Sequence, residues 1–171
     1  MSGAARPTLM RRDDFVARFG HVFEHSPWIA EAAFDKGLPP GADTAQGLHA
    51  ALCNALRAAP RERHQALIDA HPDLAGRLAR AGRLTSDSSK EQASAGLDRL
   101  SEEEHARFTA LNEAYKARFG FPFIMAIKGS SKEMILAAFE RRLQHDREEE
   151  EATALEEIEK IALLRLKDLL P

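Results

Sequence analysis

Residues 101–120, SEEEHARFTALNEAYKARFG, carry the clearest helical pattern in this chain. Ser101 and Glu104 have the spacing of a capping box, in which each side chain accepts a hydrogen bond from the other residue's backbone N–H at a helix N-terminus. The helical pattern runs up to Gly120. Three apolar residues share one face of the turns between: Phe108, Leu111 and Tyr115. The stretch predicts a long helix with one buried face.

The composition extends this prediction to the whole chain. Among 171 residues there are 30 alanines and 20 leucines, whereas valine occurs only at Val16 and Val22. Alanine and leucine favour helices, and β-branched residues favour strands. Residues 121–127 form the one plausible strand, and no second run exists to pair with it, so we expect extended backbone there. The predicted fold is an all-α, single-domain bundle of about eight to nine helices with irregular loops around one active-site pocket.

Capping residues set the expected boundaries of other helices. Asp43 or Thr44 is expected to cap one helix, and Ser131 to cap another. A final helix is predicted over residues 147–170, with acidic residues at its start and basic residues near its end, as the helix dipole favours. The acidic run 148–151 is expected to form a solvated first turn.

The length suits one globular domain, which buries roughly 70% of its unfolded surface on folding. Residues 1–11 mix Gly, Ala, Pro and Arg without periodicity and are predicted to form a disordered leader. Residues 12–171 are predicted to form the folded domain.

Charge, cysteine content and hydropathy argue against several classes of protein. The formal net charge is -3 with both signs interspersed, so no basic footprint for a nucleic acid is present. Cys53 is the single cysteine, which rules out an internal disulfide or a thiolate metal cage and fits a reducing compartment. Neither a membrane span nor a secretory signal is visible. We therefore expect a cytoplasmic protein without nucleic-acid or membrane partners.

His71 is the first candidate for chemistry. In His71-Pro72-Asp73 the proline suits the first position of a helix, which would put the imidazole at the positive end of the helix dipole. That setting favours a neutral imidazole able to accept a proton near neutral pH. The alternative is that His71 merely caps a turn.

Ser88, Glu91 and Gln92 are the second candidate, because they offer a hydroxyl, a carboxylate and an amide within one helical turn. Such a group could bind a small polar ligand. The spacing from Ser88 to Glu91 is also that of a capping box, so a plain helix start is the alternative.

Residues 120–124, Gly-Phe-Pro-Phe-Ile, form a proline-stiffened apolar loop that could present main-chain N–H and C=O groups to a ring. The same loop could simply anchor itself in the core. Arg165 stands among leucines, where a guanidinium needs an anionic partner. That partner could be a ligand or a carboxylate of the protein.

His21 and His25 are four residues apart and could share a metal ion, but no third ligand accompanies them. Ordinary core or surface histidines are the favoured interpretation, and no metal site is predicted. Serine-hydrolase, phosphate-loop and dinucleotide motifs are absent from the sequence.

Five ordered motifs together resemble one family. They are His-Pro-Asp-Leu-Ala at 71–75, Ser-x-x-Glu-Gln at 88–92 followed by Ala-Gly-Leu at 95–97, Asn-Glu-Ala-Tyr at 112–115, Phe-Gly-Phe-Pro-Phe-Ile at 119–124, and Ile161 to Leu166. Phe-Glu-His-Ser-Pro-Trp at 23–28 adds to them. The chain resembles the 2-oxo-4-hydroxy-4-carboxy-5-ureidoimidazoline (OHCU) decarboxylase family of urate breakdown over roughly residues 8–170.

The resemblance implies an all-helical, cofactor-free enzyme that removes CO₂ from OHCU and delivers (S)-allantoin, the last step from urate. It implies that His71 is the central catalytic residue and that Glu91 is the acidic catalytic residue. The implied substrate contacts are Pro72, Ser88, Gln92, the main chain around Phe123 and Ile124, and Arg165. Relatives in this family often pair, which also suggests a homodimer.

The residue types agree with this chemistry. Loss of CO₂ leaves a carbanion, and the conjugated imidazoline ring can absorb that charge without a pyridoxal or thiamine cofactor. Our hypothesis is that His71, held by Glu91 or by main-chain groups, manages the substrate proton. The competing functions are an all-helical interaction domain and a metal hydrolase that uses His21 and His25. Convergence of the implied residues on one pocket would favour the decarboxylase.

Overall fold

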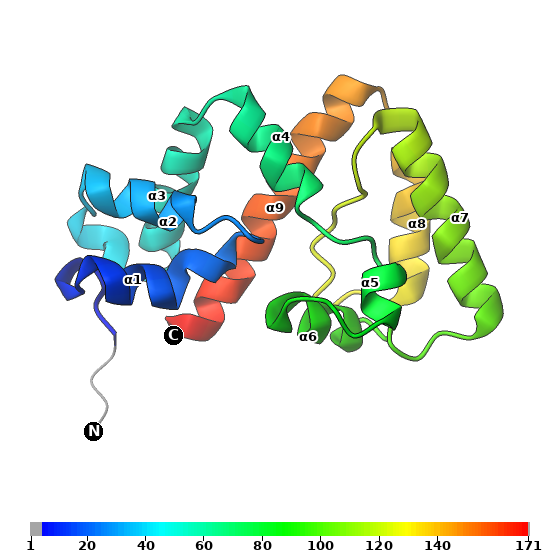
Figure 1. Cartoon of the computed structure of the whole chain (residues 1–171), viewed down its shortest axis with the longest axis horizontal. Coiled ribbons are helices and arrows are strands. Elements are labelled where there is room, and N and C mark those ends of the chain that lie inside the picture. Colours follow the sequence, from blue (N-terminus) through cyan, green and yellow to red (C-terminus); the bar gives the residue numbers. More distant parts are fainter. Residues whose placement is uncertain (1–4, 171) are drawn as a thin grey trace. The chain divides into compact units, whose positions relative to one another are not determined.

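The computed structural model describes residues 5–170 and is predominantly helical (Figure 1). Within those residues there are nine α-helices, three short 3-10 helices and no β-strand, which confirms the all-α prediction. The α-helices are α1 (Arg12–Phe19), α2 (Trp28–Lys36), α3 (Ala45–Ala58), α4 (Arg61–Asp69), α5 (Arg77–Arg80), α6 (Ser86–Ser94), α7 (Glu102–Phe119), α8 (Lys132–Arg142) and α9 (Arg147–Leu169). The 3-10 helices are η1 (Pro7–Leu9), η2 (Gly20–Val22) and η3 (Pro40–Asp43). In this described part, none of the helices has the length and hydropathy needed to span a lipid bilayer.

The chain divides into two compact units. Unit 1 comprises the residues up to Leu67 and those from Glu159 onward, and unit 2 comprises Ile68–Ile158. Helices α4 and α9 contribute residues to both units. Of the residues implied in the site, Arg165 belongs to unit 1 and the others belong to unit 2.

Unit 1 is built around α1, α2 and α3, with α2 packed against both of the others. Phe15 and Phe19 of α1 and Phe34 of α2 form an aromatic cluster with ring centroids 5.2 and 5.3 Å from that of Phe15. Thr44 caps α3, since its hydroxyl oxygen accepts a hydrogen bond from the Gly47 N–H at 3.0 Å. A side chain at Gly47 would collide with η3, because a Cβ there would lie 1.8 Å from a backbone carbonyl oxygen.

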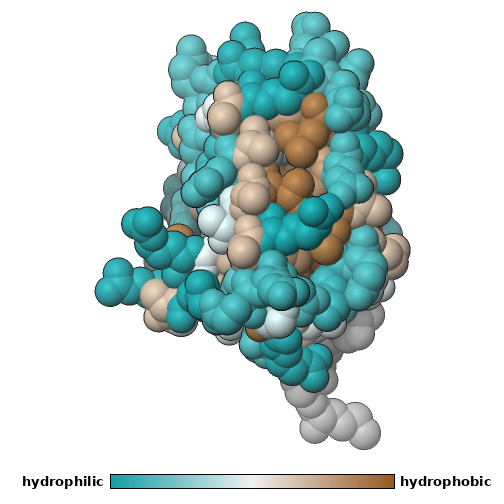
Figure 2. All heavy atoms as spheres, turned by 90° about the vertical axis from the view of Figure 1, so that its right-hand side faces the viewer, coloured by the Kyte–Doolittle hydropathy of each residue, from teal (hydrophilic) through white to brown (hydrophobic). Residues whose placement is uncertain are grey.

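Unit 2 has an aromatic core. Tyr115 of α7 meets the ring of Phe123 edge-on at 5.3 Å, and Phe123 stacks on Phe139 of α8 at 3.7 Å. The ring of Phe108 of α7 also meets the Phe139 ring edge-on. All four aromatic residues are at most 1% exposed. Figure 2 shows a strip of apolar surface between hydrophilic rims on the side that α7 and α8 occupy in Figure 1.

The capping box at the start of α7 is confirmed. The Ser101 hydroxyl oxygen accepts from the Glu104 N–H at 3.2 Å, and the Glu104 carboxylate accepts from the Ser101 N–H at 2.9 Å. Gly120 ends the helix in the left-handed conformation at φ 81°. Residues 121–127 follow as non-helical backbone outside any strand, as predicted. Ser131 caps α8 through the Met134 N–H at 3.2 Å.

The prediction of a disordered leader does not hold for residues 7–9, which form η1 with Pro7 buried. The Asp43 carboxylate accepts hydrogen bonds from the Thr8 N–H and hydroxyl at 2.8 and 2.9 Å. These bonds, with the nearby Arg6 guanidinium, lower the pKa of Asp43. A buried proline and a satisfied carboxylate give this segment a fixed position that its composition did not indicate. The predicted leader over residues 1–4 lies outside the described residues.

Candidate active site

His71 lies just beyond the C-terminal end of α4. Its N–H donates to the carbonyl oxygen of Ile68 at 3.2 Å, and the next helix, α5, begins only at Arg77. The prediction that His71 stands at a helix N-terminus is therefore wrong. A helix C-terminus carries partial negative charge, so the expected support for a neutral imidazole from a helix dipole is absent. His71 and Pro72 are both half-buried.

Gln92 of α6 holds the turn that carries His71. Its side-chain oxygen accepts a hydrogen bond from the Ala75 N–H at 2.9 Å, and its side-chain nitrogen donates to the Asp73 carbonyl oxygen at 3.3 Å. Gln92 is 5% exposed, and its bond to Ala75 is buried while its bond to Asp73 is partly buried. The sequence implied that Gln92 contacts substrate, whereas the structure uses both ends of its amide to fix residues 71–75. The two motifs at 71–75 and 88–92 are thus brought together.

A second amide and a lysine of α7 hold the same turn. Asn112, 3% exposed, donates to the Leu74 carbonyl oxygen at 2.9 Å. Lys116 pairs with the Asp73 carboxylate at 2.6 Å. Ala75 has φ 53°, a left-handed conformation that is unfavourable for a residue other than glycine, and such strain persists only where neighbouring contacts fix it. Sequence analysis missed the supporting roles of Asn112 and Lys116.

Ser88 and Glu91 lie inside α6 and do not form a capping box. The cap of this helix is Thr85, whose hydroxyl oxygen accepts from the Ser88 N–H at 3.2 Å. Ser88 is 6% exposed and Glu91 is half-buried. The alternative that Ser88 starts a helix is therefore wrong.

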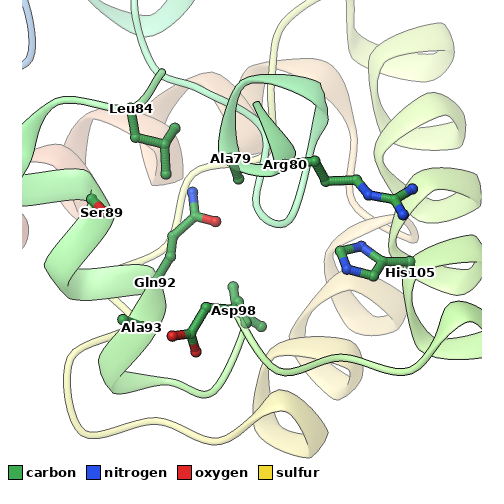
Figure 3. A pocket seen from close by; sticks show the side chains of 9 residues that line it. Ala79, Arg80, Leu84, Ser89, Gln92, Ala93, Asp98 and His105 are labelled. Carbon is green, nitrogen blue, oxygen red and sulfur yellow. The ribbon is translucent and has the colours of Figure 1, made fainter. Parts of the chain in front are cut away.

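One side of Gln92 faces a cavity of about 340 Å³ in unit 2. Figure 3 shows Gln92 and Ser89 of α6 across the cavity from His105 of α7, with Arg80 of α5 beside it. The remaining lining residues are Ala79, Leu84, Ala93, Leu97 and Asp98. This volume falls within the range of small-molecule pockets. A small polar molecule in this cavity would contact Gln92.

The loop at 121–127 is fixed by its buried side chains. Phe123 and Ile124 are 1% and 3% exposed, and the Phe123 ring stacks on Phe139 with an interplanar angle of 19°. The Ile124 carbonyl oxygen accepts a hydrogen bond from Nη1 of Arg142 at 2.6 Å. The side chains anchor this loop in the core, which was one of the two interpretations of its sequence.

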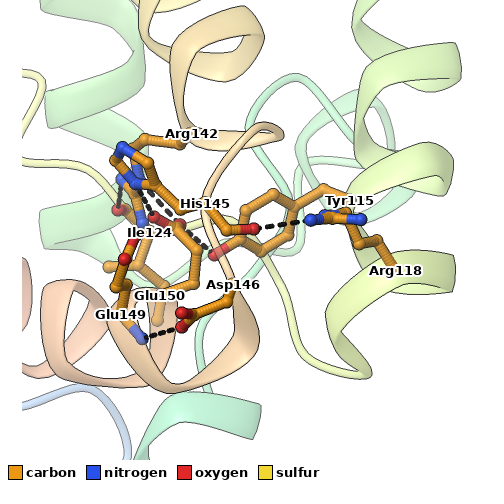
Figure 4. Close-up of polar contacts among 8 residues, drawn as sticks. All are labelled: Tyr115, Arg118, Ile124, Arg142, His145, Asp146, Glu149 and Glu150. Carbon is orange, nitrogen blue, oxygen red and sulfur yellow. Dashed lines mark hydrogen bonds and ion pairs between the residues drawn. The ribbon is translucent and has the colours of Figure 1, made fainter.

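Arg142 belongs to a buried polar cluster, shown in Figure 4, that the sequence did not reveal. Its Nε donates to the Glu150 carboxylate at 2.8 Å, and the Tyr115 hydroxyl donates to the same oxygen at 2.5 Å. Nδ1 of His145 lies 3.0 Å from the other carboxylate oxygen. Burial, and next the hydrogen bond to Glu150, raise the pKa of Tyr115.

Glu150 corrects the expectation of a solvated acidic turn. It is 0% exposed, whereas Glu148 and Glu149 of the same run are exposed. Asp146 caps α9 by accepting from the Glu149 N–H at 2.8 Å. These glutamates differ in exposure because they lie on different faces of α9, and nothing in the local sequence distinguishes the buried one.

Arg165 is paired with a carboxylate of the protein. Its Nη2 lies 2.9 Å from Oε2 of Glu24, and the two side chains are 6% and 1% exposed. Nη1 donates to the carbonyl oxygens of His21 and Val22 at 3.3 and 3.4 Å. The predicted need for an anionic partner is confirmed in unit 1, and the implied contact with substrate stays a prediction. Glu24 lies in the segment 23–28 quoted above, but its pairing was not foreseen.

Among residues 5–170 there is no group of three or more histidine, cysteine and carboxylate side chains placed to hold a metal ion. His21 and His25 therefore lack a third protein ligand within this part of the chain.

Comparisons with known proteins agree with the family resemblance. A family model described as OHCU decarboxylase matches residues 8–167. A 2-oxo-4-hydroxy-4-carboxy-5-ureidoimidazoline decarboxylase from Haloferax volcanii is 44% identical over 156 residues, 91% of this chain and 89% of that protein. One of the same description from Mus musculus is 40% identical over 157 residues, 92% of this chain and 86% of that protein.

Solved structures agree as well. An (S)-allantoin synthase superposes with a TM-score of 0.74 at 29% identity, over 96% of this chain and 52% of that chain. An OHCU decarboxylase crystallised in the presence of (S)-allantoin has a TM-score of 0.68 at 20% identity, over 94% of this chain and 99% of that chain, which shows the shared fold. The fold and its relatives define an all-helical carboxy-lyase. Since the family model and the relatives span nearly its whole length, the chain belongs to the OHCU decarboxylase family.

Proposed function

We propose that this protein decarboxylates OHCU to (S)-allantoin and that His71 is its acid-base residue. Membership of the family supports the reaction. The observation that supports the assignment of His71 is the fixed turn at 71–75, which Gln92 ties to the helix bearing Ser88 and Glu91. A catalytic side chain needs such a rigid support, because small displacements of a reacting group cost large factors in rate.

The proposed reaction is cofactor-independent. The bond from the ring carbon to the carboxylate breaks, CO₂ leaves, and the electron pair enters the conjugated imidazoline ring of the substrate. A proton then has to be delivered to one face of the ring to give a single enantiomer. His71, half-buried beside a fixed main chain, manages the proton on the substrate hydroxyl or ring nitrogen as the carboxylate leaves.

The remaining roles follow from residue type. Glu91 orients the imidazole of His71 or stabilises its protonated form, and Ser88 offers a hydroxyl to the polar substrate. Pro72 and the main chain around Phe123 and Ile124 are proposed to contact the substrate outside the cavity of about 340 Å³, whose lining residues include Gln92 but none of these three. Gln92 acts mainly by fixing the turn at 71–75, because both ends of its amide already form hydrogen bonds to that turn. Any contact with the substrate uses the remaining N–H and lone pair of the amide.

Arg165 is proposed to neutralise an anionic or carbonyl oxygen of the substrate. A guanidinium recognises oxygen atoms through directed N–H bonds, and in unit 1 this one pairs with Glu24 through Nη2 and with the His21 and Val22 carbonyls through Nη1. Arg165→Met should raise KM for OHCU more than it lowers kcat, measured well below the unfolding temperature because the change also removes the partner of the buried Glu24 carboxylate.

We also propose that residues 12–171 form the decarboxylase domain, that the protein is cytoplasmic, and that it forms a homodimer without nucleic-acid or membrane partners. The interspersed charge and the single cysteine support the cytoplasmic location and the lack of nucleic-acid binding. Sedimentation at several protein concentrations tests the dimer.

The test of the reaction is to add the purified protein to freshly generated OHCU and to follow circular dichroism and CO₂ release. We expect CO₂ release and the circular dichroism signal of (S)-allantoin to develop faster than in buffer alone. Conversion to racemic product at the rate seen in buffer would instead favour an interaction domain. A chelator should leave the rate unchanged, whereas inhibition by a chelator would favour the metal hydrolase.

A further inference from the structure

We propose that Arg142 is a positioning residue for catalysis, because its buried guanidinium sets the orientation of the substrate-contacting loop at Phe123 and Ile124. This inference rests on the proposed function, which assigns that loop to the pocket wall. It adds a residue that none of the recognised motifs contains.

The guanidinium touches the loop in two ways. Nη1 donates to the Ile124 carbonyl oxygen at 2.6 Å, and the guanidinium carbon lies 4.3 Å from the centroid of the Phe123 ring. Arg142 is 4% exposed, so water does not compete effectively for these contacts. A charge-assisted hydrogen bond in such a setting is shorter and stronger than one between neutral groups.

The hydrogen bond to the Ile124 carbonyl oxygen orients a whole peptide group. The peptide group is planar, so the direction of the Ile124 carbonyl also determines the direction of the Met125 N–H. Pro122 limits the backbone just before Phe123, because its ring locks φ. The loop therefore has its peptide planes set at one end by proline and at the other by Arg142.

Glu150 holds the guanidinium in this orientation. Its carboxylate is fully buried and accepts from Nε of Arg142 and from the Tyr115 hydroxyl through one oxygen. The other oxygen lies 3.0 Å from Nδ1 of His145. Three donors on one carboxylate leave little freedom for it to turn, and Figure 4 shows them converging from α7, from α8 and from the turn before α9.

A salt bridge that served stability alone would not need the bond to the loop. Replacement of a buried ion pair by apolar residues is often neutral or stabilising, so a buried pair is weak support for a purely structural role. Here Nη1 of Arg142 also donates a hydrogen bond to the main chain of the predicted pocket wall, at Ile124. The geometry assigns the cluster to loop orientation.

The experiment compares wild-type protein, Arg142→Lys and the control Arg18→Met at temperatures well below unfolding. Lysine keeps the charge beside Glu150 but cannot donate to Glu150 and Ile124 in the same fixed geometry. Arg18 also donates to a main-chain carbonyl, that of Leu169 at 3.1 Å, and also lies over a phenylalanine ring, but it has no contact with the cluster around Glu150. We expect Arg142→Lys to lose about 10–100-fold in kcat with a smaller change in KM, and Arg18→Met to keep both.

A chemical rescue separates positioning from stability. In Arg142→Ala, millimolar guanidinium should restore part of kcat, whereas equal concentrations of sodium or methylammonium should not. Unchanged kcat in Arg142→Lys, or rescue by every salt alike, would overturn the inference.

Tyr115→Phe decides the matter should the Arg142 variants fail to fold. This change removes one donor to Glu150 and keeps the ring, so we expect a smaller fall in kcat at a retained far-ultraviolet spectrum. Wild-type kcat in this variant would contradict the inference. Inactive wild-type protein would instead refute the proposed function itself, and the positioning role with it.

Discussion

Gln92→Leu should both destabilise the protein and impair the reaction. Leucine fills a similar space but removes the partner of two main-chain groups, the buried Ala75 N–H and the partly buried Asp73 carbonyl. Each unsatisfied buried group costs about 1–3 kcal/mol. The bond to Asp73 is long at 3.3 Å, and buried leucine recovers part of the loss, so we expect a net destabilisation of about 2–3 kcal/mol.

Urea unfolding and steady-state kinetics on the same preparation measure this change. For a denaturant slope of about 2 kcal/mol per M, the unfolding midpoint should fall by about 1 M. The activity of the folded variant should fall through kcat, because the turn that carries His71 has lost its two ties to α6. The neighbour Ser89 is exposed on the same helix, and Ser89→Ala should stay within about 0.5 kcal/mol of wild type.

A Gln92→Leu variant that unfolds at the wild-type urea concentration and alters KM alone would contradict a supporting role for Gln92. That outcome would mean that Gln92 serves as a substrate contact, as its motif implies, and that the turn keeps its shape without it.

Three further predictions concern stability and reactivity. Glu24→Ala should cost about 3–5 kcal/mol in urea unfolding because it strands the buried guanidinium of Arg165, and a loss below 1 kcal/mol would contradict the pairing. The hydrogen bond from Lys132 lowers the pKa of Glu104 from 4.5 to about 2, so this carboxylate stabilises the fold fully above pH 4.5 and progressively less as the pH falls towards 2. Glu104→Gln should therefore differ most from wild type above pH 4.5, and an equal difference at all pH values would exclude the ion pair as its cause. Burial raises the pKa of the Cys53 thiol to about 12, so a thiol reagent should react slowly at neutral pH until urea unfolds the chain, and fast reaction in the native state would contradict that burial.

Local signals in the sequence predicted much of the helical framework. The capping box at Ser101 and the caps at Thr44 and Ser131 depend on residues a few positions apart, and all three are present. The long last helix was also predicted, from residue 147 to within one residue of its end. These features need no knowledge of the tertiary structure.

The two wrong predictions about helix starts have different causes. Ser88 and Glu91 have capping-box spacing, but Thr85, three residues before Ser88, caps the helix instead, so a competing local signal decided where α6 begins. His71 precedes a proline, yet hydrogen bonds from Gln92 and other side chains shape the following residues into a turn instead of a helix.

The motifs named the candidate site residues, which stay predictions, but the contacts that hold the turn at 71–75 were not predicted. Asn112 reaches Leu74 across 38 positions, and Glu150 is the one buried member of a run of glutamates. No periodicity or spacing marks these contacts, because they exist only after α7 and α9 have packed. Gln92 and Asn112 both stand in recognised motifs, yet the motifs did not reveal that these side chains hold the turn at 71–75.

The most direct test of the account is the rate of OHCU decarboxylation by His71→Asn. Asparagine keeps a polar group of similar reach but cannot carry a proton between substrate atoms near neutral pH. We predict a loss of about 10²–10⁴-fold in kcat with an unchanged far-ultraviolet spectrum and urea midpoint. Formation of (S)-allantoin by this variant at the wild-type rate would contradict the central claim.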